Sequence, residues 1–145
     1  MDEITYKDHV SALLVGEYES DRGLVRDVFR KCGWRLFEER NGLRAMGWLK
    51  RNPVQVVISE NPGAGAGWQR LLDDLRGLPE PPQLVVTSRM ADDYLWAEVL
   101  NRGGYDVLPQ PLDRDEVERV LAAAGRHYSA ARGGLLRTSS AGTAA

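Results

Sequence analysis

The sequence shows its clearest buried-strand pattern at Val54-Gln-Val-Val-Ile58, a short run in which β-branched apolar residues dominate. Three further runs of this kind and one mixed run occur along the chain. Apolar residues at successive positions indicate strands covered on both faces, as in parallel sheets. The further runs are Ser11-Ala-Leu-Leu-Val15, Leu84-Val-Val-Thr87 and Tyr105-Asp-Val-Leu108, and the mixed run, expected at a sheet edge, is Arg35-Leu-Phe-Glu-Glu39.

Helical patterns fill the intervals between these runs. The clearest apolar stripe extends from Leu24 to Cys32, with its members one helical turn apart. Another extends from Val117 to Ala124, and Asp113 ahead of it is a suitable N-cap. Shorter or weaker helical patterns cover residues 44–50, 71–75 and 91–101. Strand and helix therefore alternate five times along the chain.

This alternation predicts an α/β domain over residues 11–128. Parallel strands need crossovers of about a dozen residues, and right-handed crossovers place helices on both faces of the sheet. We therefore expect a doubly wound, five-stranded parallel sheet in a flavodoxin-like, three-layer sandwich. Residues 1–10 are interpreted as an N-terminal leader. Residues 129–145 are small and polar, so they are interpreted as a flexible tail or linker.

The composition argues against several classes of protein. The 145 residues carry 19 basic and 21 acidic side chains, a net charge of −2, which disfavours a nucleic-acid-binding surface. A single cysteine, Cys32, excludes an internal disulfide and a cysteine-based metal cluster, and we expect it in the core. No apolar run approaches the ~20 residues of a membrane helix, and the polar N-terminus is unlike a secretory signal. We therefore expect a cytoplasmic domain without a membrane partner.

The carboxyl ends of the expected strands are the place where such a sheet binds ligands, next to the point where strand order reverses. Gly16 and Glu17 follow the first strand, and the segment from Ser59 to Gly67 follows the third. Thr87 ends the fourth strand, and Gln110 follows the fifth. These positions therefore contain the candidate site.

Two other features are interpreted without a catalytic role. The glycine run Gly63-Ala-Gly-Ala-Gly67 lies between a strand and a helix, where phosphates are often bound. It lacks the Lys-Ser/Thr pair of a P-loop and the glycine spacing of a dinucleotide site, so we interpret it as a turn. The two histidines, His9 and His127, lie near opposite ends of the predicted domain, and we expect both to be exposed.

The order and spacing of these segments resemble the receiver domain of bacterial two-component response regulators, over residues 11–128. The resemblance implies the strand order 2-1-3-4-5 and a signalling role rather than an enzymatic one. It rests on Leu13-Leu-Val15 before an acidic turn, Asn52-Pro-Val-Gln-Val-Val-Ile-Ser59 with Gly67 eight residues later, Leu84-Val-Val-Thr87, Arg102-Gly-Gly-Tyr-Asp106 and Leu108-Pro-Gln-Pro111.

Carried over position by position, the family's acceptor and metal ligands are mostly missing. Ser59 stands where the resemblance places the phospho-accepting aspartate, and Gly16 and Glu17 stand where it places the metal-binding acidic pair. A serine cannot form an acyl phosphate and is a weak nucleophile without an adjacent base. Mg²⁺ is normally held through carboxylates, waters and a phosphate. We therefore expect weak or no Mg²⁺ binding, with Glu17 and Asn61 as the candidate ligands.

The remaining positions of the family's site are also altered. Thr87 retains the hydroxyl that ends the fourth strand, but Gln110 replaces the lysine that meets the phosphoryl group. Loss of one such electrostatic partner typically costs ~3 kcal/mol of transition-state stabilisation. Val107 replaces the aromatic switch residue. The resemblance therefore predicts a degenerate receiver that is not phosphorylated, has no catalytic residues and needs no cofactor.

Several residues keep more than one interpretation. Glu60 lies one residue past the expected acceptor position, and it is either a solvated loop glutamate or, if the register slips, the acceptor or a built-in phosphate mimic. Trp96 either fills a groove or contacts a partner on the face formed by the fourth helix, fifth strand and fifth helix, through which receivers often pair. Interface candidates near that face, for a protein partner or a homodimer, are Arg102, Arg114 and Arg119.

The sequence leaves two candidate functions. The first is a receiver-like signalling module that acts by protein–protein contact without phosphorylation. The alternative is a small-ligand-binding domain that uses the vacated phosphorylation pocket. The rim of that pocket is expected to consist of Glu17, Ser59, Asn61, Thr87 and Gln110.

Overall fold

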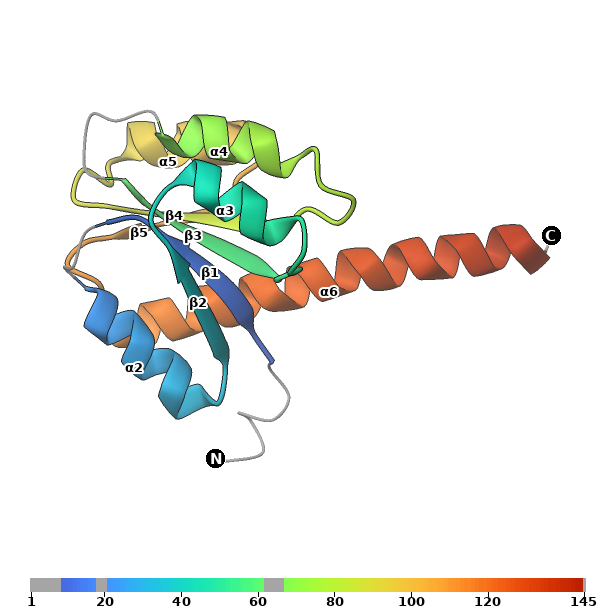
Figure 1. Ribbon diagram of the computed structural model, residues 1–145, viewed down its shortest axis with the longest axis horizontal. Helices are drawn as coiled ribbons and strands as arrows, with labels where there is room; N and C mark the ends of the chain where they lie inside the picture. The colour runs from blue at the N-terminus through green and yellow to red at the C-terminus, as the bar shows by residue number, and fades with distance from the viewer. Residues whose placement is uncertain (1–8, 18–20, 62–66, 145) are drawn as a thin grey trace.

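The computed structural model describes residues 9–17, 21–61 and 67–144, with side chains described as far as residue 132 (Figure 1). Strands and helices alternate in these segments as the sequence predicts. The strands are β1 (Ser11–Val15), β2 (Arg35–Glu39), β3 (Val56–Asn61), β4 (Gln83–Ser88) and β5 (Asp106–Pro109). The helices are α2 (Arg22–Cys32), α3 (Gly42–Leu49), α4 (Gly67–Leu75), α5 (Asp93–Asn101) and α6 (Arg114–Ala144).

The five strands form one parallel sheet in the order β2-β1-β3-β4-β5, which confirms the predicted topology. Helices α3, α4 and α5 cover one face of the sheet, and α2 and α6 cover the other (Figure 1). The chain passes from β1 outward to β2 and then returns to β3 on the other side of β1. The carboxyl ends of β1 and β3 therefore flank the point where strand order reverses.

Two apolar cores hold the helices against the sheet, one on each face. Successive residues of β1 point alternately to the two faces: Ala12 and Leu14 enter the core beneath α2 and α6, while Leu13 and Val15 enter the core beneath α3 to α5. All four are almost fully buried. Cys32 is buried in the first of these cores, as predicted, and burial raises the pKa of its thiol.

Side-chain caps fix the starts of three helices. Asn41 accepts a hydrogen bond from the Arg44 backbone N–H at the start of α3, at 2.9 Å. Asp92 caps α5 in the same way. Asp113 accepts from the Glu116 backbone N–H at 3.0 Å, which confirms the N-cap predicted for the last helix.

Helix α6 corrects the expectation for residues 129–145. The structure continues this helix to Ala144, and its last turns extend away from the sheet (Figure 1). The small and polar composition suggested a flexible tail, but the segment also contains alanine, leucine and arginine, which are strong helix formers. Extending an existing helix needs no new nucleation, so this propensity is sufficient. A linker role for the segment stays a prediction.

Candidate functional site

The register of β3 against β4 decides which polar residues lie together at the carboxyl ends of the strands. Glu60 pairs with Thr87, and Ser59 pairs with Val86. Side chains that are paired in a parallel sheet point to the same face, and successive residues point to opposite faces. Ile58 joins the core beneath α2 and α6, so Glu60, two residues later, points to that side. Ser59 points to the side of α3 to α5.

This register changes the assignment of the acceptor position. An acceptor and the hydroxyl of Thr87 can contact the same phosphoryl group only if both side chains leave the same face of the sheet. Glu60 meets this requirement and Ser59 does not. The interpretation of Glu60 as a solvated loop residue is wrong, because it lies within β3 and its side chain is only 6% exposed. Strand β3 extends three residues beyond the predicted end at Ile58.

Gly16 provides the space that the Glu60 side chain occupies. A Cβ added at Gly16 would lie 2.9 Å from the Cβ of Glu60 and would collide with its carboxylate. The backbone of Gly16 has a φ of +154°, which side-chain-bearing residues rarely adopt. The position where the resemblance expects the first metal-binding acid is therefore closed to any side chain while Glu60 keeps this conformation.

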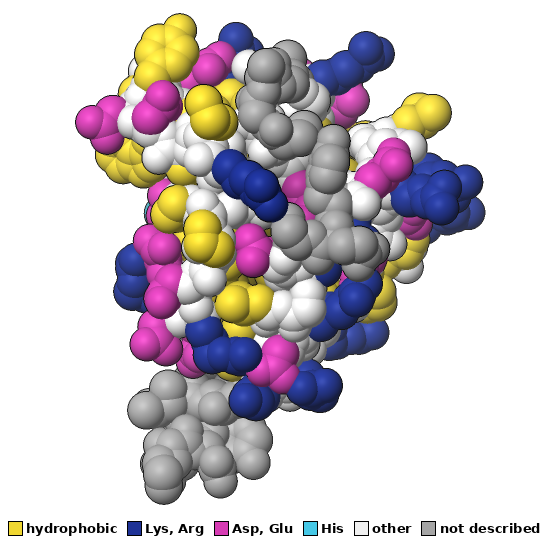
Figure 2. Space-filling view, turned by 90° about the vertical axis from the view of Figure 1, so that its left-hand side faces the viewer, with side chains coloured by type: hydrophobic (Ala, Val, Ile, Leu, Met, Phe, Trp, Pro, Cys, Tyr) yellow, Lys and Arg dark blue, Asp and Glu magenta, His cyan; other side chains and the backbone are white. Residues whose placement is uncertain are grey.

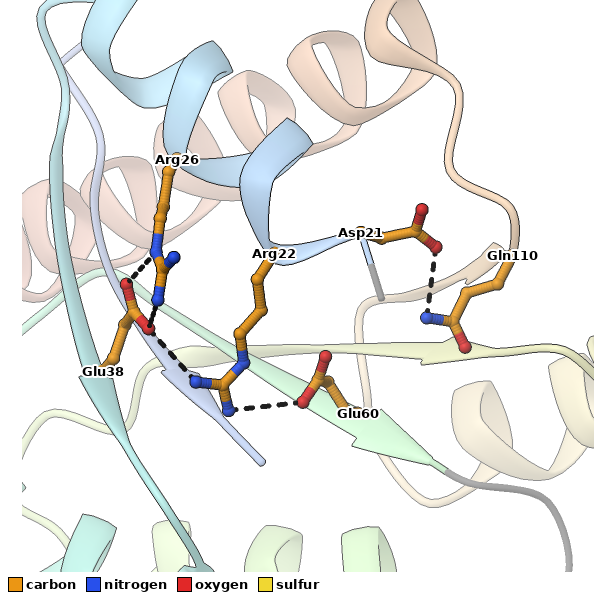
Figure 3. A network of polar contacts seen from close by, with 6 residues as sticks. All are labelled: Asp21, Arg22, Arg26, Glu38, Glu60 and Gln110. Carbon is orange, nitrogen blue, oxygen red and sulfur yellow. Dashed lines mark hydrogen bonds and ion pairs between the residues drawn. The ribbon is translucent and has the colours of Figure 1, made fainter. Parts of the chain in front are cut away.

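Arg22, in the first turn of α2, places its guanidinium between two carboxylates (Figure 3). Its Nη2 lies 3.5 Å from Oε1 of Glu60, and its Nη1 donates to Oε1 of Glu38 at 3.2 Å. The Arg22 side chain is 11% exposed. Arg26, one turn later, donates to both oxygens of Glu38 at 2.8 Å. These residues form a chain of charges that links α2 to β2 and β3.

The charge network also affects the protonation of its outer carboxylate. The hydrogen bond from Arg26, assisted by the positive charges of Arg26 and Arg22, holds the pKa of Glu38 below its ordinary value against the opposing effect of burial. Glu38 therefore stays ionised at neutral pH and holds both arginines in place.

Asp21 connects the start of α2 to the segment after β5. Its Oδ2 accepts a hydrogen bond from Nε2 of Gln110 at 3.3 Å (Figure 3). It accepts another from the backbone N–H of Leu112 at 3.3 Å. Asp21 precedes α2 but makes no side-chain cap to it. The amide of Gln110 is thus directed toward Asp21, and it supplies no positive charge to the site.

Thr87 is the in-register neighbour of Glu60 and is 2% exposed. Among the described residues its Oγ1 has no hydrogen-bond partner. The Nε and Nη2 atoms of Arg22 are likewise buried without a hydrogen bond in this part of the chain. The hydroxyl is thus buried on the same side of the sheet as Glu60.

A cavity of about 450 Å³ opens at the carboxyl ends of β1 and β3, beside α3 and α4, and Gly16 and Glu60 are among its lining residues. Glu17, Ser59 and Asn61 line it, but Thr87 and Gln110 are not among its described lining residues. Three of the five polar residues predicted to rim one pocket therefore line this cavity, and Thr87 is paired with Glu60 on the neighbouring strand. Figure 2 shows this end of the molecule, where basic and acidic side chains are interspersed.

The described residues do not fit a divalent metal ion. Within them, no three His, Cys, Asp or Glu side chains are grouped as metal ligands. Gly16 has no side chain that could act as a ligand, and Glu17 is exposed at the edge of the cavity. The buried carboxylate of Glu60 already faces the guanidinium of Arg22. A hard cation such as Mg²⁺ would need several oxygen ligands, and Arg22 would repel it.

The candidate interface residues differ in exposure. Trp96 is 50% exposed and donates from Nε1 to Asp106 at 3.3 Å. Each of the three arginines predicted near that face has an acidic neighbour in its own chain. The Arg114 pair with Asp27, at 2.6 Å, joins α6 to α2. The other pairs are Arg102 with Glu98 at 3.4 Å and Arg119 with Glu116 at 3.9 Å.

The histidines and Val107 are not members of this charge network. His9 and His127 are exposed, as expected, and the His127 ring lies 5.5 Å from the Tyr105 ring, tilted by 59°. Most of the glycine run lies outside the described residues, and its last member, Gly67, begins α4. Val107 is buried in the core beneath α3 to α5.

Sequence reasoning missed Asp21, Arg22 and Glu38. The alternation of β2 contains a signal for Glu38, because Leu36 faces the core beneath α2 and Glu38 lies two residues further. An acid at an inward-facing position of an edge strand indicates a basic partner on the covering helix.

Comparisons with known proteins support this fold. No family model matches the sequence, and a search of the curated proteins finds no relative. Among solved structures, the signal receiver domain of a LuxO-type repressor from Vibrio parahaemolyticus is 17% identical, with a TM-score of 0.75 over 86% of this chain and 95% of that one. A receiver domain of an HD-domain protein from Pseudomonas fluorescens is 22% identical, with a TM-score of 0.71 over 84% and 98%.

A third similar structure has the same fold. It is the receiver domain of a sensor histidine kinase from Pseudomonas aeruginosa, solved with a magnesium ion in its active-site cleft. It is 17% identical, with a TM-score of 0.67 over 81% of this chain and 98% of that one. The chain therefore has the receiver fold.

Proposed function

We propose that this chain is a receiver-like signalling module that works by protein–protein contact and is not phosphorylated. The observation that carries the proposal is the position of Glu60. It shares a face and a register level with Thr87, as an acceptor beside that hydroxyl must, whereas the resemblance placed the acceptor at Ser59, and its carboxylate is paired with Arg22. The carboxylate is therefore engaged within the chain and is not available to an incoming phosphoryl group.

The electrostatics of the site also disfavour phosphoryl transfer. Such a reaction needs positive charge around the transferred group, supplied by metal ions and cationic side chains. Here Gln110 is neutral and is directed toward Asp21. The positive charge of Arg22 is shared between Glu38 and Glu60. The proposal thus assigns Glu60 the role of a fixed negative charge at the acceptor position.

Treatment with acetyl phosphate and Mg²⁺, followed by intact-mass measurement, tests the absence of phosphorylation. We expect the mass of the chain to remain unchanged, while a phosphorylatable receiver domain treated in parallel gains a phosphoryl group. A stoichiometric phosphoryl adduct on this chain would contradict the proposal, and peptide mapping would then identify the acceptor.

Exposed apolar side chains on and before α5 support the second half of the proposal. Met90 is 63% exposed, Tyr94 is 79% exposed and Trp96 is 50% exposed. Large aromatic side chains often dominate the binding energy of protein interfaces. We propose that this face, together with β5 and α6, contacts a second copy of the chain or a protein partner of the signalling system.

Light scattering over a range of concentrations tests pairing between copies. We expect a mass that rises toward that of a dimer, and a lower dimer fraction for Tyr94→Ala combined with Trp96→Ala. Leu43→Ala is a matched control, because Leu43 is 87% exposed but belongs to α3. A mass that stays at that of one chain at every concentration would contradict the homodimer.

A further inference from the structure

We propose that Arg22 is a built-in cation that takes the place of a divalent metal ion at this site. The inference rests on the proposed function, because it explains how the acceptor carboxylate is neutralised in a chain that is not phosphorylated. It adds that the site has been converted from one that recruits a cation to one that carries its own.

Arg22 faces carboxylates from two different strands. Its guanidinium faces Glu60 from β3 through Nη2 at 3.5 Å and Glu38 from β2 through Nη1 at 3.2 Å. Both ends of the pair with Glu60 are well buried, with 11% and 6% of the side chains exposed. One positive group therefore bridges carboxylates from two strands (Figure 3).

The charges of these four side chains balance without any added ion. Glu38 and Glu60 contribute two negative charges, and Arg22 and Arg26 contribute two positive charges. Arg26 is 51% exposed and pairs with Glu38, whereas Arg22 also reaches the buried carboxylate of Glu60. A divalent ion placed beside Glu60 would meet the guanidinium of Arg22 at close range and would be repelled by it.

Gly16 shows that the change involves the backbone as well as the charges. Glu60 occupies the space above Gly16, so an acidic side chain at position 16 and Glu60 in this conformation exclude each other. The loss of a metal ligand at Gly16 and the pairing of Glu60 with Arg22 are therefore two parts of one rearrangement. As a result, the net charge of these side chains does not depend on the concentration of metal ions.

Binding of Mn²⁺, a spectroscopic substitute for Mg²⁺, tests this inference in the full chain. Paramagnetic resonance measures free Mn²⁺ directly, and thermal unfolding with and without Mg²⁺ provides an independent measurement. We expect no saturable binding to the unaltered chain at millimolar Mn²⁺. Arg22→Met removes the cation and leaves both carboxylates, so we expect its affinity for Mn²⁺ to rise about tenfold or more.

Two further variants serve as controls. Arg26→Met removes the exposed cation from the same network, and we expect it to gain no Mn²⁺ binding. Arg22→Met combined with Glu60→Gln removes the buried carboxylate as well, so the gain should disappear. If Arg22→Met is unfolded in EDTA, we expect millimolar Mn²⁺ to restore its folded circular dichroism spectrum, because metal binding then couples to folding.

Saturable Mn²⁺ binding by the unaltered chain would overturn the inference. So would an Arg22→Met chain that neither binds Mn²⁺ when folded nor refolds with it. These results differ from the one that would contradict the proposed function, namely a phosphoryl adduct after acetyl phosphate treatment. A chain that binds Mn²⁺ but gains no phosphoryl group would overturn the inference alone.

Discussion

Replacing Arg22 with methionine tests how much the buried charge pair contributes to stability. The substitution keeps a long side chain in the first turn of α2 and removes the guanidinium that faces Glu60. Glu38 retains its two hydrogen bonds from Arg26, so the main effect falls on Glu60. We therefore expect Arg22→Met to destabilise the folded chain.

The size of the effect follows from burial and distance. Breaking a buried ion pair by removing one partner typically costs about 3–5 kcal/mol. The side chains of Arg22 and Glu60 are 11% and 6% exposed, which places the pair in this class. Their separation of 3.5 Å exceeds that of a charge-assisted hydrogen bond, so we expect a loss at the lower end, about 3 kcal/mol.

Urea unfolding followed by circular dichroism measures this loss, in EDTA to exclude metal binding. Arg26→Met is the matched control: its partner is the same Glu38, but Arg26 is 51% exposed, so we expect a loss of about 1 kcal/mol or less. Combining Arg22→Met with Glu60→Gln should recover part of the stability, because no unmatched charge then remains buried. Equal losses for Arg22→Met and Arg26→Met would show that burial of the Glu60 pair does not determine the cost.

Three more perturbations give expected outcomes. Gly16→Ala should lower the free energy of unfolding in urea by about 2 kcal/mol or more, because the added Cβ would lie 2.9 Å from the Cβ of Glu60. Gly47→Ala is the control, because Gly47 lies in open space on α3 and its substitution should be neutral or stabilising. Comparable losses for the two variants would contradict this reasoning. Thr87→Val should be neutral or stabilise the chain by up to about 1 kcal/mol, because the buried hydroxyl has no hydrogen-bond partner among the described residues. A clear fall in the thermal unfolding midpoint would show that the hydroxyl has such a partner. The pKa of Glu38 is lowered on folding, so its contribution to stability is present above its ordinary pKa of 4.5 and is lost as pH falls through the folded pKa. Glu38→Gln should therefore reduce the pH dependence of the unfolding midpoint at acid pH. An unchanged pH dependence in that range would show that Glu38 does not contribute to it.

The strand order and the helices were predictable because they depend on local periodicity. The apolar runs and the stripe from Leu24 to Cys32 contain the information for strand and helix, and the alternation of the two restricts the topology. The end of β3 was not predictable in this way. Pairing of Glu60 with Thr87 and of Asn61 with Ser88 extends β3, and this pairing depends on a strand distant in sequence. A difference of one residue there determines which side chain lies beside Thr87.

The charge network was even less accessible from sequence. Arg22, Glu38 and Glu60 are brought together only when α2 packs across β1, β2 and β3, so no spacing along the chain predicts their contact. The outer end of α6 was missed for another reason. Its composition suggested a tail, whereas helix extension depends on the residues that precede it.

The most direct test of whether Arg22 and Glu60 replace a phosphorylation site is to add beryllofluoride and Mg²⁺. Beryllofluoride is an analogue of a bound phosphoryl group. Amide spectra of the isotopically labelled chain, recorded with and without both reagents, report on each position of the site. If Arg22 and Glu60 form a closed pair, the amide signals of Gly16, Glu60 and Thr87 will not move. Saturable shifts of these three signals on addition of both reagents would show instead that the site still accepts a phosphoryl group and a metal ion.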